Sequence, residues 1–573
     1  MSKDLIHEFN AVTRKSNFQL NEVDPITTEI IRNALNSAAN QMKQALCRTA
    51  FSPIIYEVLD FASAIYDKDV RLLAQAPSLP LFMGTLNFCI EEAVKAVGGE
   101  EELYEGDIII YNNPYGTGAH QPDVALVMPV FTAKNKLIGY TAIKAHWLDI
   151  GAKDPYCSDT IDYFQEGVVF PGVKLFEKGI LVDSVHRMIL ANSRLPKAID
   201  GDMRAQCNGL QAGAKAFIGI VEKYGEEIFF NCVEIIFNHG ESIVKNYFKK
   251  IPNGRYVGEG LMDNDGLSND KIPFKVAVDI HDDGVILDYT DAEEQQRGPV
   301  NCPMPSTVSA ARIAISMLAG GGESPTEGHF RPIKVITKKG TLFHPNPPAP
   351  CFLYGWPAMQ SIEVIYRAIG SMFPELVPSD SAGDICSMVF WGFNSSTGEP
   401  WADGAPYPTG QGASDVGDGS SVLHIAESAT RFSSTEVRES LYPYVLNKVE
   451  FAQDSCGAGT HNGGMGIDFD FEFLDDTYLT ATLEKTLTKP QGLLGGKEAR
   501  PNDCTIVLPD GKKKQIGKIT RFYLPKGSHL FLKTGGGAGY GKPENRDSES
   551  IKRGVEDELL SNNYLKEHYP QMV

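Results

Sequence analysis

The first hundred residues of the chain alternate between helical and strand-like patterns of hydrophobic positions. After Asp24-Pro25, a typical helix start, apolar residues recur at helical spacing and predict a helix that runs through Leu46. Residues 61–74 predict a hairpin that turns at Asp67-Lys68-Asp69. Residues 86–97 predict a second helix, which ends at a pair of glycines.

Three short hydrophobic runs follow and predict strands over residues 108–111, 124–131 and 137–145. A turn-rich loop separates the first run from the second. His120 and Asp123 lie where one predicted strand begins, and His146 lies where another ends. Functional groups often occupy such strand–loop junctions, and adjacent strands would bring these side chains together.

The remaining sequence is helical over 202–248 and becomes β-rich from about residue 255, with one helix near 307–319. Residues 340–358 are rich in proline and are interpreted as an ordered loop. Residues 395–422, rich in glycine, serine, aspartate and proline, are open to two interpretations: a flexible lid or a solvated loop.

The fold class predicted from these patterns is mixed α+β, in several units. We expect N-terminal helices with a metal-bearing sheet, followed by β-rich units with glycine turns, because 573 residues are too many for one core. The predicted division is a loose arm (1–22), a metal-bearing α+β domain (23–252), a β-rich domain with interspersed helices (253–546) and a charged helical tail (547–573).

Composition narrows the class of partner and the compartment. The net charge of −20 argues against nucleic acid or an anionic membrane as a main partner. No apolar run approaches the ~20 residues that span a bilayer, and the N-terminus lacks the pattern of a secretory signal. The 10 cysteines form no C-x-x-C pair, so we expect small core residues in a reducing cytoplasm.

The residues with the clearest chemistry are His120-x-x-Asp123 and His146. Two imidazoles with one or two carboxylates suit a borderline divalent metal. Either histidine could instead satisfy a hydrogen bond at a strand end. Spacing alone leaves both interpretations open, because no fixed sequence template defines such a site.

A glycine-rich segment, Gly536 to Lys542, matches G-x-x-x-x-G-K only superficially. Pro543 follows where a phosphate-binding loop carries serine or threonine, so the hydroxyl for magnesium is missing. A tight glycine turn is the favoured interpretation. No G-x-S-x-G elbow for a nucleophilic serine is present.

Ten short segments carry a family pattern. They are, in order, Asp24-Pro-Ile-Thr-Thr-Glu-Ile-Ile-Arg-Asn, Arg48-Thr-Ala-Phe-Ser-Pro, Asp60-Phe-Ala-Ser-Ala, Gly118-Ala-His-Gln-Pro-Asp, His146-Trp-Leu-Asp-Ile-Gly, Phe164-Gln-Glu-Gly, Gly201-Asp-Met-Arg-Ala-Gln, Arg297-Gly-Pro-Val-Asn-Cys-Pro, Arg331-Pro-Ile-Lys-Val-Ile and Gly535-Gly-Gly-Ala-Gly-Tyr-Gly-Lys-Pro-Glu-Asn-Arg-Asp. In these segments the chain resembles the hydantoinase B family. That family includes subunits of N-methylhydantoinase, caprolactamase and acetone and acetophenone carboxylases, and part of ATP-dependent 5-oxoprolinase.

The resemblance implies a site and a partner. It implies a divalent metal bound by Asp60, His120, Asp123 and His146. Nitrogen and carboxylate ligands suit zinc, manganese and iron, and zinc is the favoured ion. The resemblance makes Asp149 a candidate outer carboxylate or general base. It also implies a hetero-oligomer with an A-type subunit, of the actin-like ATPase type, that binds ATP and magnesium.

The predicted function is therefore that of the metal-bearing B-type member of an ATP-dependent cyclic-amide hydrolase. Hydantoin, 5-oxoproline or lactam rings are the substrates that the resemblance implies. One alternative is a subunit of an ATP-dependent ketone carboxylase that uses bicarbonate. Another is a non-catalytic scaffold subunit. The chain departs from many relatives at Leu81-Phe82-Met83-Gly84, where they carry a histidine, and at Cys456 and Thr460-His461, which leaves the substrate open.

Overall fold

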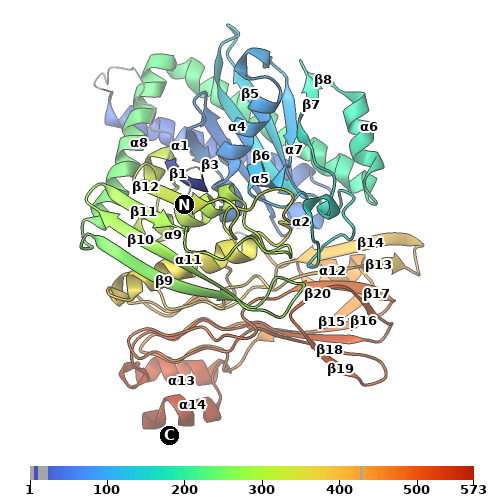
Figure 1. The fold of residues 1–573 in the computed structure, drawn as a ribbon, viewed down its shortest axis with the longest axis vertical. Helices are drawn as coiled ribbons and strands as arrows, with labels where there is room; N and C mark the ends of the chain where they lie inside the picture. Colours follow the sequence, from blue (N-terminus) through green and yellow to red (C-terminus); the bar gives the residue numbers. More distant parts are fainter. Residues whose placement is uncertain (1–4, 11–22, 426–429, 573) are drawn as a thin grey trace. The chain divides into compact units, whose positions relative to one another are not determined.

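The computed structural model of the chain describes residues 5–10, 23–425 and 430–572 (Figure 1). It contains two compact units that are interleaved along the sequence. Unit 1 comprises Met1–Lys153, Thr160–Tyr256 and Val276–Ala358, and unit 2 comprises Asp154–Asp159, Val257–Lys275 and Met359–Val573. The domain bounds predicted above stay a prediction; the compact units differ from them because residues 276–358 return to unit 1.

A seven-stranded sheet forms the centre of unit 1, in the order β3-β2-β6-β5-β4-β7-β8. Every neighbouring pair is antiparallel. The strands are β2 (Phe61–Asp67), β3 (Leu72–Gln75), β4 (Ile108–Tyr111), β5 (Asp123–Phe131), β6 (Leu137–His146), β7 (Pro171–Glu177) and β8 (Ile180–Leu181). The predicted hairpin and the three predicted strands are confirmed.

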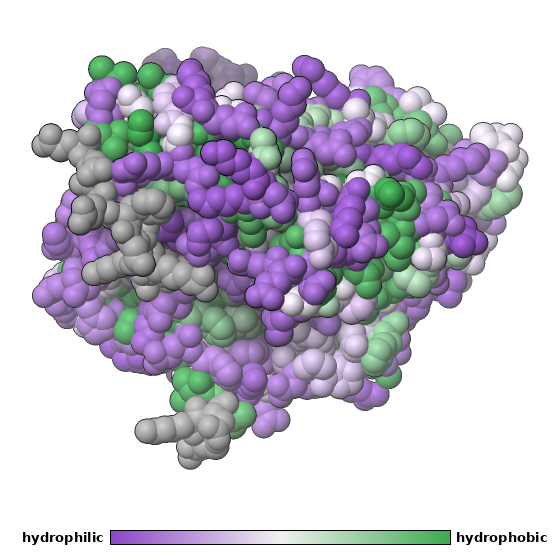
Figure 2. Space-filling view, turned by 90° about the horizontal axis from the view of Figure 1, so that it is seen from above, coloured by the Kyte–Doolittle hydropathy of each residue, from purple (hydrophilic) through white to green (hydrophobic). Residues whose placement is uncertain are grey.

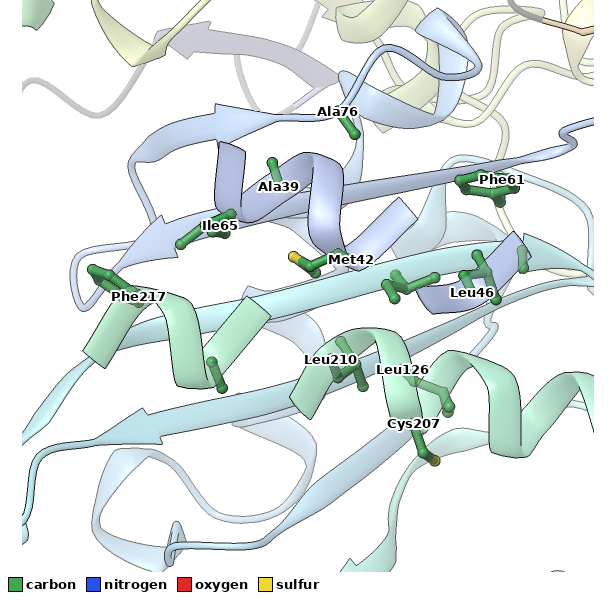
Figure 3. Packing of buried hydrophobic residues seen from close by; sticks show 14 of the residues in the cluster. Ala39, Met42, Leu46, Phe61, Ile65, Ala76, Leu126, Cys207, Leu210 and Phe217 are labelled. Carbon is green, nitrogen blue, oxygen red and sulfur yellow. The ribbon is translucent and has the colours of Figure 1, made fainter. Parts of the chain in front are cut away.

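Two long helices, α1 (Pro25–Thr49) and α7 (Pro196–Tyr224), pack side by side on one face of this sheet (Figure 3). The side chain of Asp24 accepts the backbone N–H groups of the first turn of α1 and so fixes where the helix begins. A Cβ atom at Gly213 would lie 2.4 Å from the side chain of Met42. Glycine at this position lets the two helices approach closely enough to bury their shared apolar face.

Unit 1 contains further helices. They are α2 (Pro53–Tyr56), α3 (Pro80–Met83), α4 (Leu86–Ala96), α5 (Pro114–Thr117), α6 (Asp183–Ala191), α8 (Glu226–Phe248), α9 (Met304–Ala319) and α10 (Glu327–Phe330). A second sheet has the order β1-β12-β11-β10-β9, formed by β1 (Ile6–Asn10), β9 (Gly254–Met262), β10 (Ile272–His281), β11 (Gly284–Asp288) and β12 (Ile333–Lys338).

The predicted N-terminal arm lies partly outside the described residues, which omit 1–4 and 11–22. Its described part differs from a loose arm, because β1 pairs antiparallel with β12. This pairing satisfies the backbone hydrogen bonds of a polar segment, and its composition alone did not predict a strand.

Unit 2 contains two sheets that share one hydrophobic core, as in a β-sandwich. The first sheet, in the order β14-β13-β17-β20, is formed by β13 (Ser387–Asn394), β14 (Glu399–Ala405), β17 (Thr477–Thr482) and β20 (Lys518–Leu524). The second, in the order β15-β16-β21-β18-β19, is formed by β15 (Tyr444–Phe451), β16 (Ile467–Phe473), β18 (Asp503–Val507), β19 (Lys513–Ile516) and β21 (His529–Lys533). The helices α11 (Gly355–Gly370), α12 (Thr435–Leu441), α13 (Ser548–Glu556) and α14 (Asn562–His568) complete the chain. The mixed α+β class and the helical tail are confirmed.

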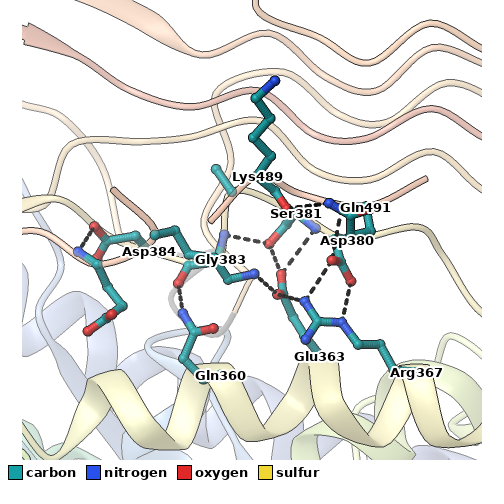
Figure 4. Close-up of polar contacts among 12 residues, drawn as sticks. Gln360, Glu363, Arg367, Asp380, Ser381, Gly383, Asp384, Lys489 and Gln491 are labelled. Carbon is teal, nitrogen blue, oxygen red and sulfur yellow. Dashed lines mark hydrogen bonds and ion pairs between the residues drawn. The ribbon is translucent and has the colours of Figure 1, made fainter. Parts of the chain in front are cut away.

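A network of charged side chains connects α11 with the segment around Asp380 and with Lys485 (Figure 4). The Lys485 Nζ atom lies 2.6 Å from an oxygen of Glu363, and the Arg367 guanidinium forms two hydrogen bonds to Asp380. These opposite charges compensate one another where water has little access. Removal of one partner would leave an uncompensated charge, which typically costs about 3–5 kcal/mol.

The glycines of unit 2 allow extended backbones to pack directly against one another. A Cβ atom at Gly410 would lie 2.1 Å from the carbonyl oxygen of Gly464, and one at Gly537 would lie 1.7 Å from that of Gln411. Part of the 395–422 stretch is therefore packed backbone, because Gly410 and Gln411 belong to these contacts and Tyr407 is buried. Only glycine fits where two chains approach this closely.

Burial of His424 in unit 2 predicts acid sensitivity. Burial lowers the pKa of its imidazole to about 4, against an opposing hydrogen bond with the backbone of Asp384. The folded protein then stays neutral at this ring while the unfolded chain takes up a proton, so stability falls as pH drops from about 6.5 to 4. Between pH 7 and pH 5 we expect wild type to lose about 2 kcal/mol more than His424→Gln. Urea unfolding at both pH values measures this, and equal losses in the two proteins would contradict it.

Three observations concern the surface, the helices and the cysteines. On the face shown in Figure 2, hydrophilic residues predominate and hydrophobic residues form small separate groups. Within the described ranges, no helix has both the length and the apolar character needed to cross a bilayer. All ten cysteines are free thiols. The predicted cytoplasmic location, and the prediction of no nucleic-acid or membrane partner, stay predictions.

Candidate metal centre

The strand register brings three of the four predicted ligands together. Asp123, the first residue of β5, is directly opposite His146, the last residue of β6. The Nδ1 atom of His146 lies 2.8 Å from Asp123 Oδ1, and the Nε2 atom of His120 lies 3.0 Å from the same oxygen. The two ring nitrogens are 3.1 Å apart. The three atoms therefore converge on one point, as the ligands of a single ion would.

The tautomer of His120 suits a ligand. Its Nδ1 atom lies 2.8 Å from the carbonyl oxygen of Phe352, which can only accept a hydrogen bond. A neutral ring must therefore carry its proton on Nδ1, so that Nε2 presents its lone pair to the cluster. This is the usual arrangement of a metal-ligating histidine whose other nitrogen donates to a carbonyl.

Asp123 is held on both oxygens. The Tyr354 hydroxyl donates to Oδ2 at 3.0 Å, which leaves Oδ1 facing the two histidines. Burial acts to raise the pKa of this carboxyl, but its interactions with His120 and His146 outweigh burial and hold the pKa below its ordinary value. The group is thus an anion at neutral pH, as a metal ligand must be.

Asp60 lies beside the cluster. Its carbonyl oxygen accepts the backbone N–H of His146, which places it at the start of β2 next to the end of β6. Its carboxylate is not among the atoms that lie within 4.8 Å of one another. Burial raises the pKa of the Asp60 carboxyl to about 7; His146 and Lys144 oppose this shift, and Asp123 adds to it. The predicted role of Asp60 as a fourth ligand stays a prediction.

A buried lysine, Lys144, lies near Asp123 and Asp60 and was missed from the sequence. It precedes His146 by two residues on β6 and therefore shares its face of the sheet. Its ammonium donates to Thr85 Oγ1 at 2.5 Å and to the Thr117 carbonyl at 3.1 Å. Burial lowers the pKa of Lys144, whereas Cys89, Asp123 and Asp60 act to raise it. The signal in the sequence was a lysine at an inward position of an otherwise apolar strand.

The structure places Asp149 in a different network. Within the described residues its carboxylate is bound by the Gly151 N–H at 3.2 Å, by the Ser193 hydroxyl at 3.4 Å and by Arg194, through both the backbone and the guanidinium. Both oxygens are therefore occupied. These contacts support a positioning role for the 193–194 turn, and they give no support to the predicted general-base role.

Substitution of Asp149 separates the two roles. From the contacts we expect Asp149→Asn to leave the metal content of the purified chain unchanged and to lose about 1 kcal/mol of stability, a value reduced because Arg194 is partly exposed. Under the hydrolase function that the resemblance implies, turnover should fall less than tenfold. A fall of about 10²–10⁴-fold at unchanged stability would instead establish the proton-transfer role. Steady-state kinetics and thermal melts of the same preparation distinguish these outcomes.

Three residues outside the predicted ligand set support the cluster, and two of them lie far along the chain from the histidines. Phe352 and Tyr354 come from the predicted proline-rich loop, and Glu166 comes from the Phe164-Gln-Glu-Gly segment. Glu166 accepts the backbone N–H groups of Cys351 and Phe352 and so holds this loop in place. The aromatic residues that interrupt the prolines were the only signal in the sequence for the loop's contribution.

Comparison with known proteins identifies the family of this chain. The family described as Hydantoinase B/oxoprolinase matches residues 24–543. A protein of Pseudomonas sp. strain NS671, named as the B component of a putative D-/L-hydantoinase, is 28% identical over 557 residues, which are 94% of this chain and 93% of that protein. The resemblance inferred from the ten segments is thereby confirmed.

Two solved structures show the same fold. The ATP-dependent caprolactamase from Pseudomonas jessenii superimposes with a TM-score of 0.88 at 24% identity and covers 96% of each chain. The nucleotide-free acetone carboxylase superimposes with a TM-score of 0.85 at 18% identity, over 97% of this chain and 80% of that one. The match over residues 24–543 decides the assignment: the chain belongs to the hydantoinase B/oxoprolinase family.

Proposed function

We propose that this chain is the metal-bearing B-type member of an ATP-dependent cyclic-amide hydrolase. The observation that carries the proposal is the buried convergence of His120, Asp123 and His146 on one point. A relative named as the B component of a putative hydantoinase and a structural neighbour named as an ATP-dependent caprolactamase support the substrate class. The substrate would be a hydantoin, 5-oxoproline or a lactam.

The residues of the site fit a divalent cation. Two imidazole nitrogens and one carboxylate oxygen are suitable ligands for zinc, with manganese or iron as alternatives. When bound, such an ion supplies Lewis-acid polarisation of a carbonyl oxygen or of water. His120 and His146 would hold it, both only 6% exposed, so that bulk water is largely excluded. Tyr354 restrains Asp123 and thereby keeps Oδ1 directed at the histidines.

The lysine beside the cluster suits an anionic reactant. Burial lowers the pKa of Lys144, and in its protonated form its ammonium would act on Asp60, Asp123 and a bound anion. A phosphorylated amide, formed from ATP on a partner subunit, would be such an anion. We propose that ATP and magnesium are bound by an A-type subunit and that the two chains form a hetero-oligomer, as the naming of the hydantoinase relative as one of several subunits suggests.

A second candidate is a subunit of an ATP-dependent ketone carboxylase, with bicarbonate as the co-substrate. The observation in its favour is the fold shared with acetone carboxylase over nearly the whole chain. A bound metal ion and a protonated Lys144 would also act to stabilise an enolate. The scaffold alternative is weaker, because a scaffold does not need three convergent, buried ligating side chains.

Co-expression with the A-type subunit tests the proposal. ADP release by the purified complex is measured with hydantoins, 5-oxoproline, lactams, and ketones with and without bicarbonate. The hydrolase predicts ADP release and a ring-opened product with at least one cyclic amide. ADP release that requires both a ketone and bicarbonate would establish the carboxylase instead. A complex whose activity does not depend on His120 would favour the scaffold.

A further inference from the structure

Both backbone polar groups of Phe352 form hydrogen bonds to buried side chains. Its N–H donates to Glu166 Oε1 at 2.9 Å, and its carbonyl oxygen accepts from His120 Nδ1 at 2.8 Å. Its ring also packs against the ring of His120, with centroids 4.6 Å apart. The position of this residue therefore sets the orientation of the His120 imidazole.

The Glu166 side chain is fully buried and forms most of its hydrogen bonds to the loop that contains Phe352. Its carboxylate accepts the N–H of Cys351 at 2.9 and 3.1 Å, as well as that of Phe352, and the Thr160 hydroxyl donates to it at 2.8 Å. Within the described residues Glu166 forms no ion pair, and burial raises its pKa to about 8. The hydrogen bonds from Cys351, Phe352 and Thr160 compensate the cost of burying this side chain.

We infer that Glu166 is a positioning residue for the proposed metal centre, which orients His120 through the backbone of Phe352. The arrangement resembles an acidic side chain that supports a ligating histidine, with the backbone of one residue inserted between them. Glu166 fixes the N–H of Phe352, and this holds the carbonyl oxygen of the same residue where His120 Nδ1 donates to it, so that Nε2 faces the cluster. The inference rests on the proposed function, because it needs a metal at Nε2.

Zinc affinity of the purified full chain, measured by competition with a chelating dye, tests the inference. Glu166→Ala removes the acceptor, and we expect it to weaken Zn²⁺ binding by about 10–100-fold, as loss of a supporting contact to a metal-ligating histidine does. Glu166→Gln keeps an oxygen acceptor and should restore affinity to within about fivefold of wild type. If Glu166→Ala does not fold, Glu166→Asp, which withdraws the acceptor by one methylene, should weaken binding by about 3–10-fold.

Asp107→Ala is the matched control. Asp107 is also buried and accepts two backbone N–H groups, from Tyr104 at 3.0 Å and Lys178 at 2.8 Å; it differs in an ion pair with Lys174 at 2.8 Å, and it lies just before β4, away from the histidines. We expect it to lower the melting temperature as Glu166→Ala does, without weakening Zn²⁺ binding. The visible absorption of the Co²⁺-loaded protein should change in Glu166→Ala and stay unchanged in Asp107→Ala.

The outcomes separate this inference from the proposed function. Wild-type protein that binds no Zn²⁺ would overturn the metal centre and the inference together. Wild-type protein that binds Zn²⁺ while Glu166→Ala binds it equally well would overturn the inference alone. Equal weakening in Glu166→Ala and Asp107→Ala would also overturn it, because the effect would then reflect stability rather than the orientation of His120.

Discussion

His120→Ala should lower the metal content of the purified chain from about one ion to less than about 0.1 ion per chain. The variant removes Nε2, one of three converging atoms, and leaves Asp123 and His146 as an incomplete set. Activity of the complex with its partner should fall by about 10³-fold or more, because the ion contributes several kcal/mol of charge stabilisation. Addition of Zn²⁺ should raise the melting temperature of wild type and not that of the variant.

His186→Ala is the matched control for this experiment. His186 forms a similar pair with Asp200, at 2.7 Å, but no third ligating side chain joins that pair in the described clusters. Its substitution should leave metal content unchanged. Elemental analysis of wild type, His120→Ala, His146→Ala and His186→Ala, purified in parallel, gives the comparison. Full metal content in both His120→Ala and His146→Ala would show that the ion is bound elsewhere.

The isolated chain should neither hydrolyse ATP nor bind it tightly, and function should appear only with the A-type subunit. The segment from Gly536 to Lys542 is the part that most resembles a phosphate loop in sequence. A phosphate loop needs free backbone N–H groups. Here the N–H groups of residues 537–541 all donate to backbone carbonyls, for example Gly537 to Gly464 and Gly539 to Lys497.

Calorimetry with ATP and magnesium measures this prediction. We expect no heat of binding from the isolated chain, and ATP turnover that rises from background by at least about 10³-fold when the partner is added. A permanent complex of this kind should bury more than about 2,000 Å². Micromolar or tighter ATP binding by the chain alone would contradict the division of labour between the two proteins.

Local patterns in the sequence predict those parts of the fold that local interactions determine. The cap at Asp24 and the apolar spacing after it define α1, and hydrophobic runs define β4, β5 and β6. The approach of Asp123 to His146 follows from the antiparallel pairing of two consecutive strands. The proximity of the two histidines and Asp123 could therefore be predicted from the sequence.

The rest of the site depends on contacts between distant residues. Phe352 and Tyr354 reach His120 and Asp123 across more than 200 residues, and no periodicity marks such a contact. Asp149 forms an ion pair with Arg194, 45 residues later, and no pattern in the sequence near Asp149 predicts this contact. Lys144 shows the same limitation, since lysine is rarely buried and its place inside the pocket follows only from the strand register.

Crystallographic anomalous scattering from the purified chain, recorded on both sides of the metal absorption edge, tests the metal centre most directly. The site described above predicts one strong peak, about 2.0–2.2 Å from His120 Nε2, His146 Nδ1 and Asp123 Oδ1. A fourth ligand at this peak would show whether Asp60 completes the set. A chain with full metal content and no peak among these three atoms would contradict the central claim.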